Sequence, residues 1–378
     1  MDKFEIVIPC IFGLEALIAK ELKWLGYETH KVEDGRVTFL GTFEDVARAN
    51  LYLRCGERVL IKIGEFTATS FEELFEKTKA LDWSRWLSKN SAFPVKGFCL
   101  KSTLASMRDC QAIIKKAVVS SLSEKYGIEW FEEDGASYQI QFSVMKDLVT
   151  LMIDTSGDGL HKRGYRRISN AAPLKETIAA AMVMLSFWKY EYPLCDPFCG
   201  SGTLPIEAAM FKRNIAPGLM RTFACEGFDQ SDAVMWSRLR EEAQSKRRDT
   251  PLTILASDID PATIEIATEN ARIAGLSDVI KPQVGDATKF TSDIRYGSII
   301  CNPPYGERLS DATECQKLYR DMGKAFEKLP DWSYYILASD ENFENNFGRK
   351  ADKRRKIYNG MIKCNIFQYY GARPPKNL

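Results

Sequence analysis

The sequence contains few of the residues that build metal sites or disulfide frameworks. Only two of its 378 residues are histidines, His30 and His161, and its ten cysteines include no Cys-x-x-Cys pair. Structural zinc sites need cysteine and histidine ligands at short, regular spacings, and small disulfide-linked domains are dense in cysteine. The sequence therefore predicts neither a bound metal nor a disulfide framework, and its scattered cysteines favour a reducing, cytoplasmic setting.

Long apolar segments and an excess of charge are also missing. No uninterrupted apolar run approaches the roughly 20 residues that span a bilayer, and acidic residues near the N-terminus exclude a signal peptide. The net charge of +1 gives no indication of a nucleic-acid partner. We expect a soluble cytoplasmic protein of two or three domains, with no membrane partner and with an oligomeric state that the sequence leaves open.

Positive charge is nevertheless concentrated in three short segments, at residues 161–167, 246–248 and 349–356. Basic clusters in a neutral chain are typical of a surface that follows phosphate groups. They are equally typical of an ordinary solvated surface. The sequence leaves both interpretations open.

Residues 1–66 predict a small α+β unit. A strand at 4–9, a helix at 13–26, a hairpin at 32–40, a helix at 43–53 and a strand at 58–66 follow one another. This order is typical of a ferredoxin-like unit.

Residues 67–156 predict a second α+β unit. Ser70 caps a helix to about Leu87, and a strand at 95–102, a helix at 109–126 and a hairpin at 138–153 follow. This order and length resemble the THUMP domain, which is an RNA-binding module of RNA-modifying enzymes. The alternative is an α+β cap that shapes a small-molecule pocket.

Residues 157–378 predict a third domain, of α/β class. A helix runs from Pro173 to about Tyr190, and strand-like and helical segments alternate from Leu194 onward, as in a doubly wound, mostly parallel sheet. Lys353–Tyr358 and Met361–Tyr370 flank an Asn-Gly turn and predict an antiparallel hairpin at the end. This arrangement resembles the class I methyltransferases.

One stretch of that domain indicates a catalytic role. The apolar run from Tyr296 to Cys301 reads as a buried strand, and it ends at Asn302-Pro303-Pro304-Tyr305, where two prolines supply no backbone N–H. The loop therefore presents the Asn302 amide, the Pro303 carbonyl and the Tyr305 ring at the ligand-binding edge of the sheet. Two oxygen acceptors and a flat ring suit an exocyclic amino group on a planar base.

This stretch resembles the fourth motif of amino-methyltransferases that use S-adenosyl-L-methionine. The resemblance implies that Asn302, Pro303 and Tyr305 are the catalytic residues. They would hold a planar nitrogen while it attacks the activated methyl group, with no general base assigned. The alternative is a proline-stiffened turn with a buried tyrosine.

A second stretch, Asp196 to Thr203, lies between a short strand and a helix. Two glycines, Gly200 and Gly202, allow the backbone to pass close to a ligand, whereas Pro205 replaces the third glycine of a nicotinamide-binding loop. The stretch resembles the first motif of class I methyltransferases. The resemblance implies that Asp196, Phe198, Gly200 and Gly202 bind the methionine part of the cofactor.

Acidic residues follow the next two predicted strands as well. A carboxylate at the end of the second strand can accept bonds from ribose hydroxyls, and by resemblance Asp258 has that role while Ile259 packs on the adenine. Asp260 is expected to cap the helix that begins at Pro261. By resemblance Asp286 accepts from the adenine amino group, and Asn302 completes the cofactor site.

Taken over its whole length, the chain resembles the THUMP-bearing RNA guanine-N2 methyltransferases, above all those of bacterial 23S rRNA. The resemblance implies an enzyme of rRNA processing that methylates guanine N2 and has RNA as its partner. Three alternatives stay open: tRNA as the substrate, adenine N6 in DNA as the target, and a non-enzymatic RNA-binding or ribosome-assembly factor.

Overall fold

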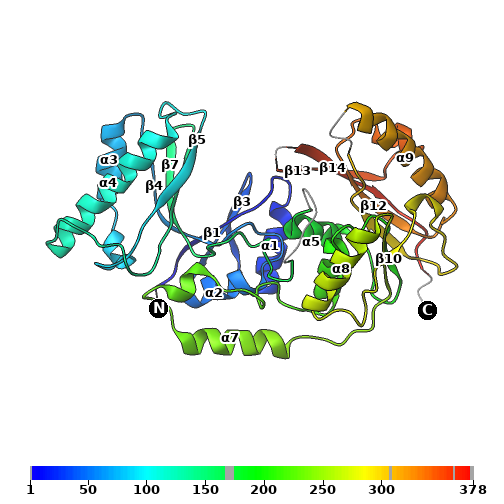
Figure 1. Ribbon diagram of the computed structural model, residues 1–378. Coiled ribbons are helices and arrows are strands. Elements are labelled where there is room, and N and C mark those ends of the chain that lie inside the picture. The colour runs from blue at the N-terminus through cyan, green and yellow to red at the C-terminus, as the bar shows by residue number, and fades with distance from the viewer. Residues whose placement is uncertain (1, 167–173, 306–308, 361, 375–378) are drawn as a thin grey trace. The chain divides into compact units, whose positions relative to one another are not determined.

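The computed structural model describes residues 2–166, 174–305, 309–360 and 362–374. Arg167, Pro173 and Met361, which the sequence analysis placed in a basic cluster, a helix and a hairpin, lie outside them. The chain divides into two compact units (Figure 1), one of residues 1–10, 18–160 and 221–242 and the other of residues 11–17, 161–220 and 243–378. Each unit contains one seven-stranded sheet.

The sheet of the first unit has the order β2-β3-β1-β4-β7-β6-β5. All of its neighbouring strands are antiparallel except β5 and β6, which are parallel. The elements that lie wholly or mostly in this unit are β1 (Phe4–Pro9), α1 (Glu15–Trp24), β2 (Thr29–Glu33), β3 (Arg36–Gly41), α2 (Phe43–Tyr52), β4 (Leu60–Thr67), α3 (Phe71–Lys79), η1 (Trp83–Arg85), β5 (Val95–Leu100), α4 (Met107–Tyr126), β6 (Ile140–Met145), β7 (Leu148–Asp154), η2 (Ala224–Gly227) and α7 (Ala233–Ser245).

Strand β4 joins the two predicted N-terminal parts into one sheet. It pairs with β1 through Leu60 and Ile61, and with β7 along its whole length. Helices α3 and α4 cover one face of the β4–β5 half of the sheet (Figure 1). Because the sheet continues through both parts, a division at residue 66 stays a prediction.

Residues 221–242 belong to the first unit although residues 161–220 of the second precede them in sequence. The Phe228 ring stacks on Tyr138 with centroids 3.9 Å apart, and the Tyr138 hydroxyl accepts from the Asp229 N–H at 2.7 Å. Arg48 donates to both oxygens of Glu242, at 2.8 and 2.9 Å. The sequence analysis did not predict α7, although Trp236, Leu239 and Ala243 are buried at helical spacing.

The sheet of the second unit has the order β10-β9-β8-β11-β12-β14-β13. Strands β10 to β12 in that order are parallel, and β14 and β13 are antiparallel. Its elements are α5 (Glu176–Leu185), β8 (Leu194–Asp196), α6 (Thr203–Lys212), β9 (Ile254–Asp258), α8 (Pro261–Ile273), β10 (Gln283–Val284), η3 (Ala287–Lys289), β11 (Ser298–Cys301), α9 (Leu309–Glu327), β12 (Ser333–Ala338), α10 (Phe343–Phe347), β13 (Lys353–Asn359) and β14 (Ile362–Tyr369).

This order confirms the predicted doubly wound sheet with a terminal hairpin. The direction of winding reverses between β8 and β11, and in open α/β sheets ligands bind at the carboxyl ends of the strands beside such a reversal. Asp196 is the last residue of β8, and Asn302 directly follows β11. The fold therefore brings the two strongest sequence motifs to one place.

Three predicted elements are shorter than expected. Helix α3 ends at Lys79 rather than near Leu87, and the separate 3-10 helix η1 follows it. Helix α5 ends at Leu185 rather than near Tyr190, because the buried Trp188 turns its indole N–H to the Tyr192 carbonyl at 2.8 Å. The strand expected at 279–284 is reduced to β10, Gln283–Val284. Pro282, which precedes it, has no N–H to donate to a neighbouring strand.

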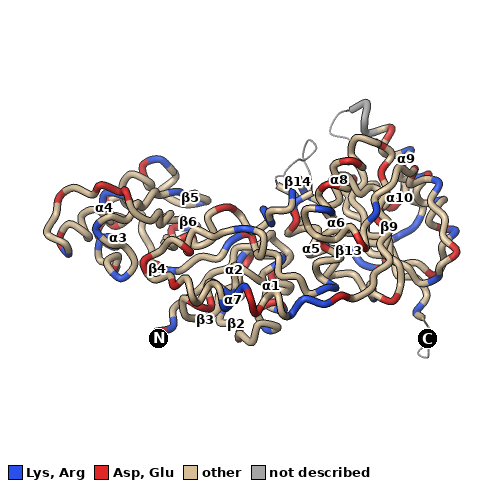
Figure 2. Tube along the Cα trace, turned by 60° about the horizontal axis from the view of Figure 1, so that its bottom comes forward, with Lys and Arg blue, Asp and Glu red and all other residues tan. Residues whose placement is uncertain are grey.

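Over its described residues, the basic segment at 161–167 is exposed at Lys162 but not at Arg163. Arg163 is buried, and its Nε and Nη2 each lie 3.2 Å from an oxygen of the buried Glu207, which also accepts from the Tyr165 hydroxyl at 3.2 Å. The side chains at 246–248 are exposed. Figure 2 shows residues of both charges interspersed through both units, in keeping with the near-zero net charge.

Among the helices in the described parts of the chain, none combines the length and the apolar character needed to cross a bilayer.

We expect Glu207→Gln to destabilise the second unit by roughly 3–5 kcal/mol, because it removes the carboxylate that faces a buried guanidinium. Thermal unfolding should show this as a lower midpoint. The matched control is Glu269→Gln, whose partner Arg272 is 68% exposed, and it should leave the midpoint unchanged. Equal midpoints for the two variants would contradict a stabilising role for the buried pair.

Candidate active site

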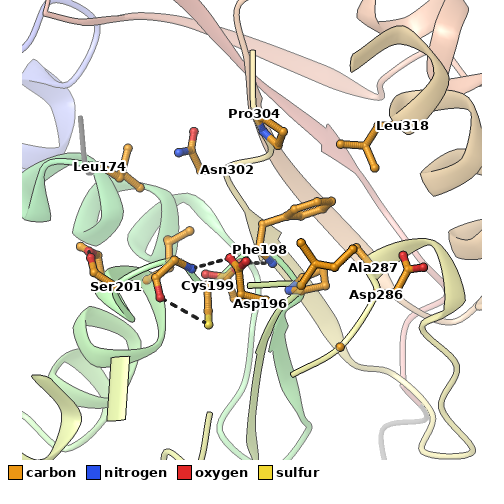
Figure 3. Close-up of a pocket in the computed structure, with 17 residues that line it drawn as sticks. Leu174, Asp196, Phe198, Cys199, Ser201, Asp286, Ala287, Asn302, Pro304 and Leu318 are labelled. Atoms are coloured by element: carbon orange, nitrogen blue, oxygen red, sulfur yellow. Dashed lines mark hydrogen bonds between the residues drawn. The ribbon is translucent and has the colours of Figure 1, made fainter. Parts of the chain in front are cut away.

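A cavity of about 540 Å³ opens where β8, β9, β10 and β11 end (Figure 3). It lies within the second unit and is bounded by the loop after each of these strands. The residues that line it are Leu174, Asp196, Pro197, Phe198, Cys199, Gly200, Ser201, Thr203, Leu204, Asp258, Ile259, Gly285, Asp286, Ala287, Asn302, Pro304 and Leu318.

Most of the site residues that the sequence analysis selected line this cavity. Seven line the cavity: Asp196, Phe198, Gly200, Asp258, Ile259, Asp286 and Asn302. Gly202, Pro303 and Tyr305 are not among its lining residues, and Pro304 takes part instead.

Asp196 is a buried carboxyl at the cavity floor. It is 1% exposed, and its Oδ1 accepts from the Phe198 N–H at 3.2 Å. Burial, followed by the charge of Asp258, raises its pKa well above the ordinary value for an aspartate. No ion pair with Asp196 is seen in the described part of the chain. An acid placed in this way is suited to a ligand that carries positive charge.

The two glycines have different surroundings. Gly200 has φ +51°, its N–H donates to Asp258 Oδ2 at 3.0 Å, and an added Cβ would meet only the Phe198 carbonyl oxygen, at 4.0 Å. Gly202 has φ +84°, and a Cβ there would lie 3.3 Å from the Cβ of Ala267 in α8. Gly200 therefore leaves room toward the cavity, whereas Gly202 lets α6 begin close to α8.

Asp258 is fixed by two backbone donors. Its Oδ2 accepts from Gly200 and its Oδ1 accepts from the Asp260 N–H at 3.1 Å. The predicted cap of α8 is confirmed, because Asp260 accepts from the Ala262 N–H at 3.0 Å. Each Asp258 oxygen keeps a further lone pair, so the carboxylate can still accept from hydroxyl groups of a ligand.

Ile259 and Asp286 form one side of the cavity. Ile259 is 71% exposed, which leaves a large apolar side chain open to a flat ligand. Asp286 caps η3: its Oδ1 accepts from the Thr288 N–H at 2.9 Å and the Thr288 hydroxyl at 2.6 Å. The bonds from Thr288 lower the pKa of Asp286. Asp286 is thus a helix cap and a cavity wall at once.

The loop after β11 is held from two sides. The Tyr305 hydroxyl donates to Asn302 Oδ1, and the Tyr319 hydroxyl of α9 donates to the Pro304 carbonyl at 2.7 Å. Figure 3 shows the Asn302 amide at the cavity between Leu174 and Pro304. In this structure the Asn302 oxygen accepts from the Tyr305 hydroxyl, and its second lone pair can still accept from an incoming amino group.

The sequence analysis missed several residues of this site. The sequence analysis did not single out Tyr319, which supports the loop, and Leu174 and Leu318 are ordinary core residues in pattern. Thr203 lines the cavity and accepts from Arg166 Nη2 at 2.7 Å. A hydroxyl at the first turn of the helix after a Gly-x-Gly loop is the signal that could have drawn attention to it.

A doubly wound sheet with an antiparallel terminal hairpin and a cavity at its reversal is the arrangement of class I methyltransferases, and comparison with known proteins agrees. Residues 163–368 match the model of an RMKL-like methyltransferase domain. Residues 5–60 match an RlmL ferredoxin-like domain, and residues 68–154 match a THUMP domain. The chain belongs to this RMKL-like methyltransferase family, and the predicted ferredoxin-like and THUMP units are confirmed.

Full-length relatives support the assignment. The chain is 46% identical over 379 residues to "Putative RNA methyltransferase YpsC" of Bacillus subtilis (strain 168), covering 100% of this chain and 98% of the relative. A possible methylase from Clostridium difficile 630 superimposes with a TM-score of 0.95 at 48% identity, with 100% of both chains covered. The structure described as "SMU.472, a putative methyltransferase complexed with SAH" has a TM-score of 0.92 at 43% identity, with 99% of this chain and 100% of that chain covered.

The protein is therefore a methyltransferase, and the expected cofactor, S-adenosyl-L-methionine, is confirmed by its family and by that SAH-bound relative. The residues present fit this group. The buried Asp196 carboxyl faces the cavity without an ion-pair partner among the described residues, and the Cβ position of Gly200 is open. Asp258 adds free acceptor capacity, and Ile259 adds exposed apolar surface.

The raised pKa of Asp196 leads to a prediction about pH. Because its folded-state pKa lies above the unfolded value, the folded state keeps a proton that the unfolded chain has lost, so stability falls as pH rises through that window. Asp196→Asn should remove this component and make the protein without cofactor more stable, relative to wild type, near pH 8 than near pH 5. Thermal unfolding at both pH values measures the difference.

Cofactor binding should show the opposite trend in the wild type. Affinity should rise with pH as Asp196 ionises, and Asp196→Asn should bind more weakly with a flatter profile by titration calorimetry. The matched control is Asp278→Asn. Because Arg213 lowers the pKa of Asp278, the contribution of Asp278 to stability is lost as pH falls, and its replacement should leave the pH profile of cofactor affinity unchanged. If Asp196→Asn keeps the wild-type pH profile, Asp196 is not the titrating group.

Proposed function

We propose that the protein transfers a methyl group from S-adenosyl-L-methionine to the exocyclic N2 amine of a guanine in 23S rRNA. The observation that carries this proposal is the position of Asn302. Its amide lies in the wall of the cavity that contains Asp196 and Asp258, at the end of the strand beside the sheet reversal.

The cofactor, when bound, supplies a methyl group already attached to a good leaving group, so the protein needs no nucleophilic side chain. Asp196 faces the positively charged methionine part, and Gly200 leaves room for it. Asp258 accepts from the ribose hydroxyls, and Ile259 packs on the adenine. Asp286, although it caps η3, retains acceptor capacity for the adenine amino group.

The loop after β11 acts on the other reactant. The Asn302 Oδ1 and the Pro303 carbonyl accept the two N–H bonds of the target amine, whose nitrogen becomes cationic as it is methylated. Acceptors fixed beforehand by two prolines stabilise that developing charge. The Tyr305 hydroxyl leaves Asn302 when the amine arrives, which frees the ring to stack on the base.

RNA is the proposed substrate because of the domain ahead of the catalytic one. THUMP domains occur in RNA-modifying enzymes, and the related B. subtilis protein is named an RNA methyltransferase. The choice of 23S rRNA and of guanine N2 rests on the sequence resemblance described above. TrmN from Thermus thermophilus shares the fold at 18% identity, with a TM-score of 0.69.

A second candidate is adenine N6 in DNA. A protein from Listeria monocytogenes str. 4b F2365, 48% identical over 98% of this chain and 97% of its own, with a TM-score of 0.93, is described as a predicted N6-adenine-specific DNA methylase. The loop around Asn302 would accept an adenine amine equally well. The THUMP domain favours RNA over this alternative.

Methyl transfer from labelled cofactor to protein-free 23S rRNA, tRNA and duplex DNA, followed by nucleoside analysis, tests the proposal. N2-methylguanosine in 23S rRNA alone would support the proposal. The same product in tRNA alone would make tRNA, and not 23S rRNA, the substrate. N6-methyladenine in DNA would overturn both the proposed base, guanine, and the proposed nucleic acid, RNA. A partly assembled large ribosomal subunit is included as a fourth substrate, and absence of transfer to all four would overturn the proposal.

We expect Asn302→Ala to lower kcat by about 10²-fold, because one fixed acceptor of the transition state is lost. Cofactor affinity, measured by calorimetry, should stay close to the wild-type value. The matched control is Asn346→Ala, a partly buried asparagine of α10 outside the cavity, which should leave kcat unchanged. Wild-type turnover by Asn302→Ala would remove Asn302 from the mechanism.

A further inference from the structure

The first unit has a sheet face that its helices leave open. Helix α4 covers the face formed by alternate residues of β5 such as Cys99, whose Sγ lies 3.8 Å from Cys110 Sγ of α4, and α3 lies beside α4 on the same side (Figure 1). The residues between these alternates therefore belong to the other face.

Three large apolar side chains gather on that other face. Strands β5 and β6 run parallel with Phe98 opposite Ser143 and Leu100 opposite Met145. Phe98 and Leu100 are each 50% exposed, and Met145 is 40% exposed. Because β5 is the edge strand of the sheet, apolar side chains exposed there invite unwanted strand pairing. Their presence points to a binding role.

Positive charge surrounds these side chains. Lys96 is exposed on β5 at the same alternation as Phe98 and Leu100, and Lys101 and Lys146 follow the ends of β5 and β6. Arg108 is exposed in the first turn of α4. In the described residues, none of these four cations forms an ion pair. Their charge is therefore available to a negatively charged partner.

The two loops that carry the lysines are held together. The Thr103 N–H donates to Asp147 Oδ1 at 2.6 Å, and Ser102 Oγ donates to the Val144 carbonyl at 3.2 Å. Lys101 and Lys146 both have left-handed backbones, with φ of +50° and +51°. Non-glycine residues adopt this conformation only where the surrounding structure compensates for its cost. The lysines thus project from fixed positions, which reduces the ordering cost of binding.

We propose that this face, formed by Phe98, Leu100 and Met145 with Lys96, Lys101 and Lys146, binds an unpaired segment of the RNA substrate. A base stacks on Phe98, sugar and base edges contact the aliphatic side chains, and the lysines contact phosphates. An unpaired strand fits because the faces of its bases are open, whereas those of a duplex are stacked on one another. The proposal rests on RNA being the substrate and deepens it.

Phe98→Ala tests the stacking contact. Its affinity for protein-free 23S rRNA, measured by fluorescence anisotropy without cofactor, should fall about tenfold, with the salt dependence unchanged because no charge is lost. The matched control is Trp24→Ala, since Trp24 is 54% exposed on α1 and lies outside the face; it should bind as the wild type does. A short single-stranded RNA should displace the rRNA more effectively than a duplex of the same sequence.

The double variant Lys101→Ala/Lys146→Ala tests the phosphate contacts. It should weaken binding and reduce the slope of log affinity against log salt by about 0.7 for each lysine. The matched control is Lys125→Ala, an exposed lysine in the last turn of α4, which should keep the wild-type slope. The circular dichroism spectrum and the thermal unfolding of every variant should match those of the wild type, which shows that the first unit is folded.

The outcomes separate this surface from the proposed function. If the wild type binds no RNA, RNA as the substrate fails, and this proposal fails with it. If the wild type binds RNA and Phe98→Ala binds it equally well, only the surface is overturned. If Phe98→Ala instead changes the molar mass by sedimentation and leaves RNA affinity unchanged, the face joins two copies of the chain, which also overturns the proposal.

Discussion

The active site depends on a carboxyl group placed where a carboxylate is unfavourable. Asp196 ends β8 in the middle of the parallel sheet, buried, with a raised pKa and with a backbone N–H as a hydrogen-bond donor. Replacing it would favour the empty protein and harm binding of a cationic ligand, so stability is given up at the floor of the cavity. The loops around Asp196 are held in place, since the Gly200 N–H donates to the Asp258 carboxylate, and the site therefore stays folded despite this loss of stability.

The loop that presents Asn302 is rigid for a different reason. Pro303 and Pro304 stop the strand through their covalent structure, and Tyr319 anchors the Pro304 carbonyl from α9. Only the Tyr305 hydroxyl has a partner, Asn302 Oδ1, that a substrate amine would also need. The backbone is thus held in place, and in the proposed mechanism the hydrogen bond between Tyr305 and Asn302 is the part that changes on binding. This division suits a reaction in which the protein contributes alignment and acceptors.

Sequence reasoning succeeded where the information was local. Strand ends marked by an acid or a proline located Asp196, Asp258, Asp286 and Asn302, and all four line one cavity because parallel strands end at one edge. It failed where the answer depended on a distant partner. Arg163 looked like part of a surface cluster, yet its partner Glu207 lies 44 residues away in α6. Such a pairing leaves no periodic signal, and charge patterning favours the exposed interpretation.

The path of the chain constrains how the two units can form. Residues 221–242 complete the first unit, with Phe228 on Tyr138 and Arg48 on Glu242, but they are made only after β8 and α6 of the second. The first unit therefore cannot finish folding until residue 242 has been made, and its closing contacts are long-range. The same path argues against removing residues 1–155 to isolate the catalytic domain, because the inserted segment would lose Tyr138, on which the buried Phe228 stacks. Single substitutions on the open face keep that segment in place, so a change in RNA binding can be attributed to the face itself.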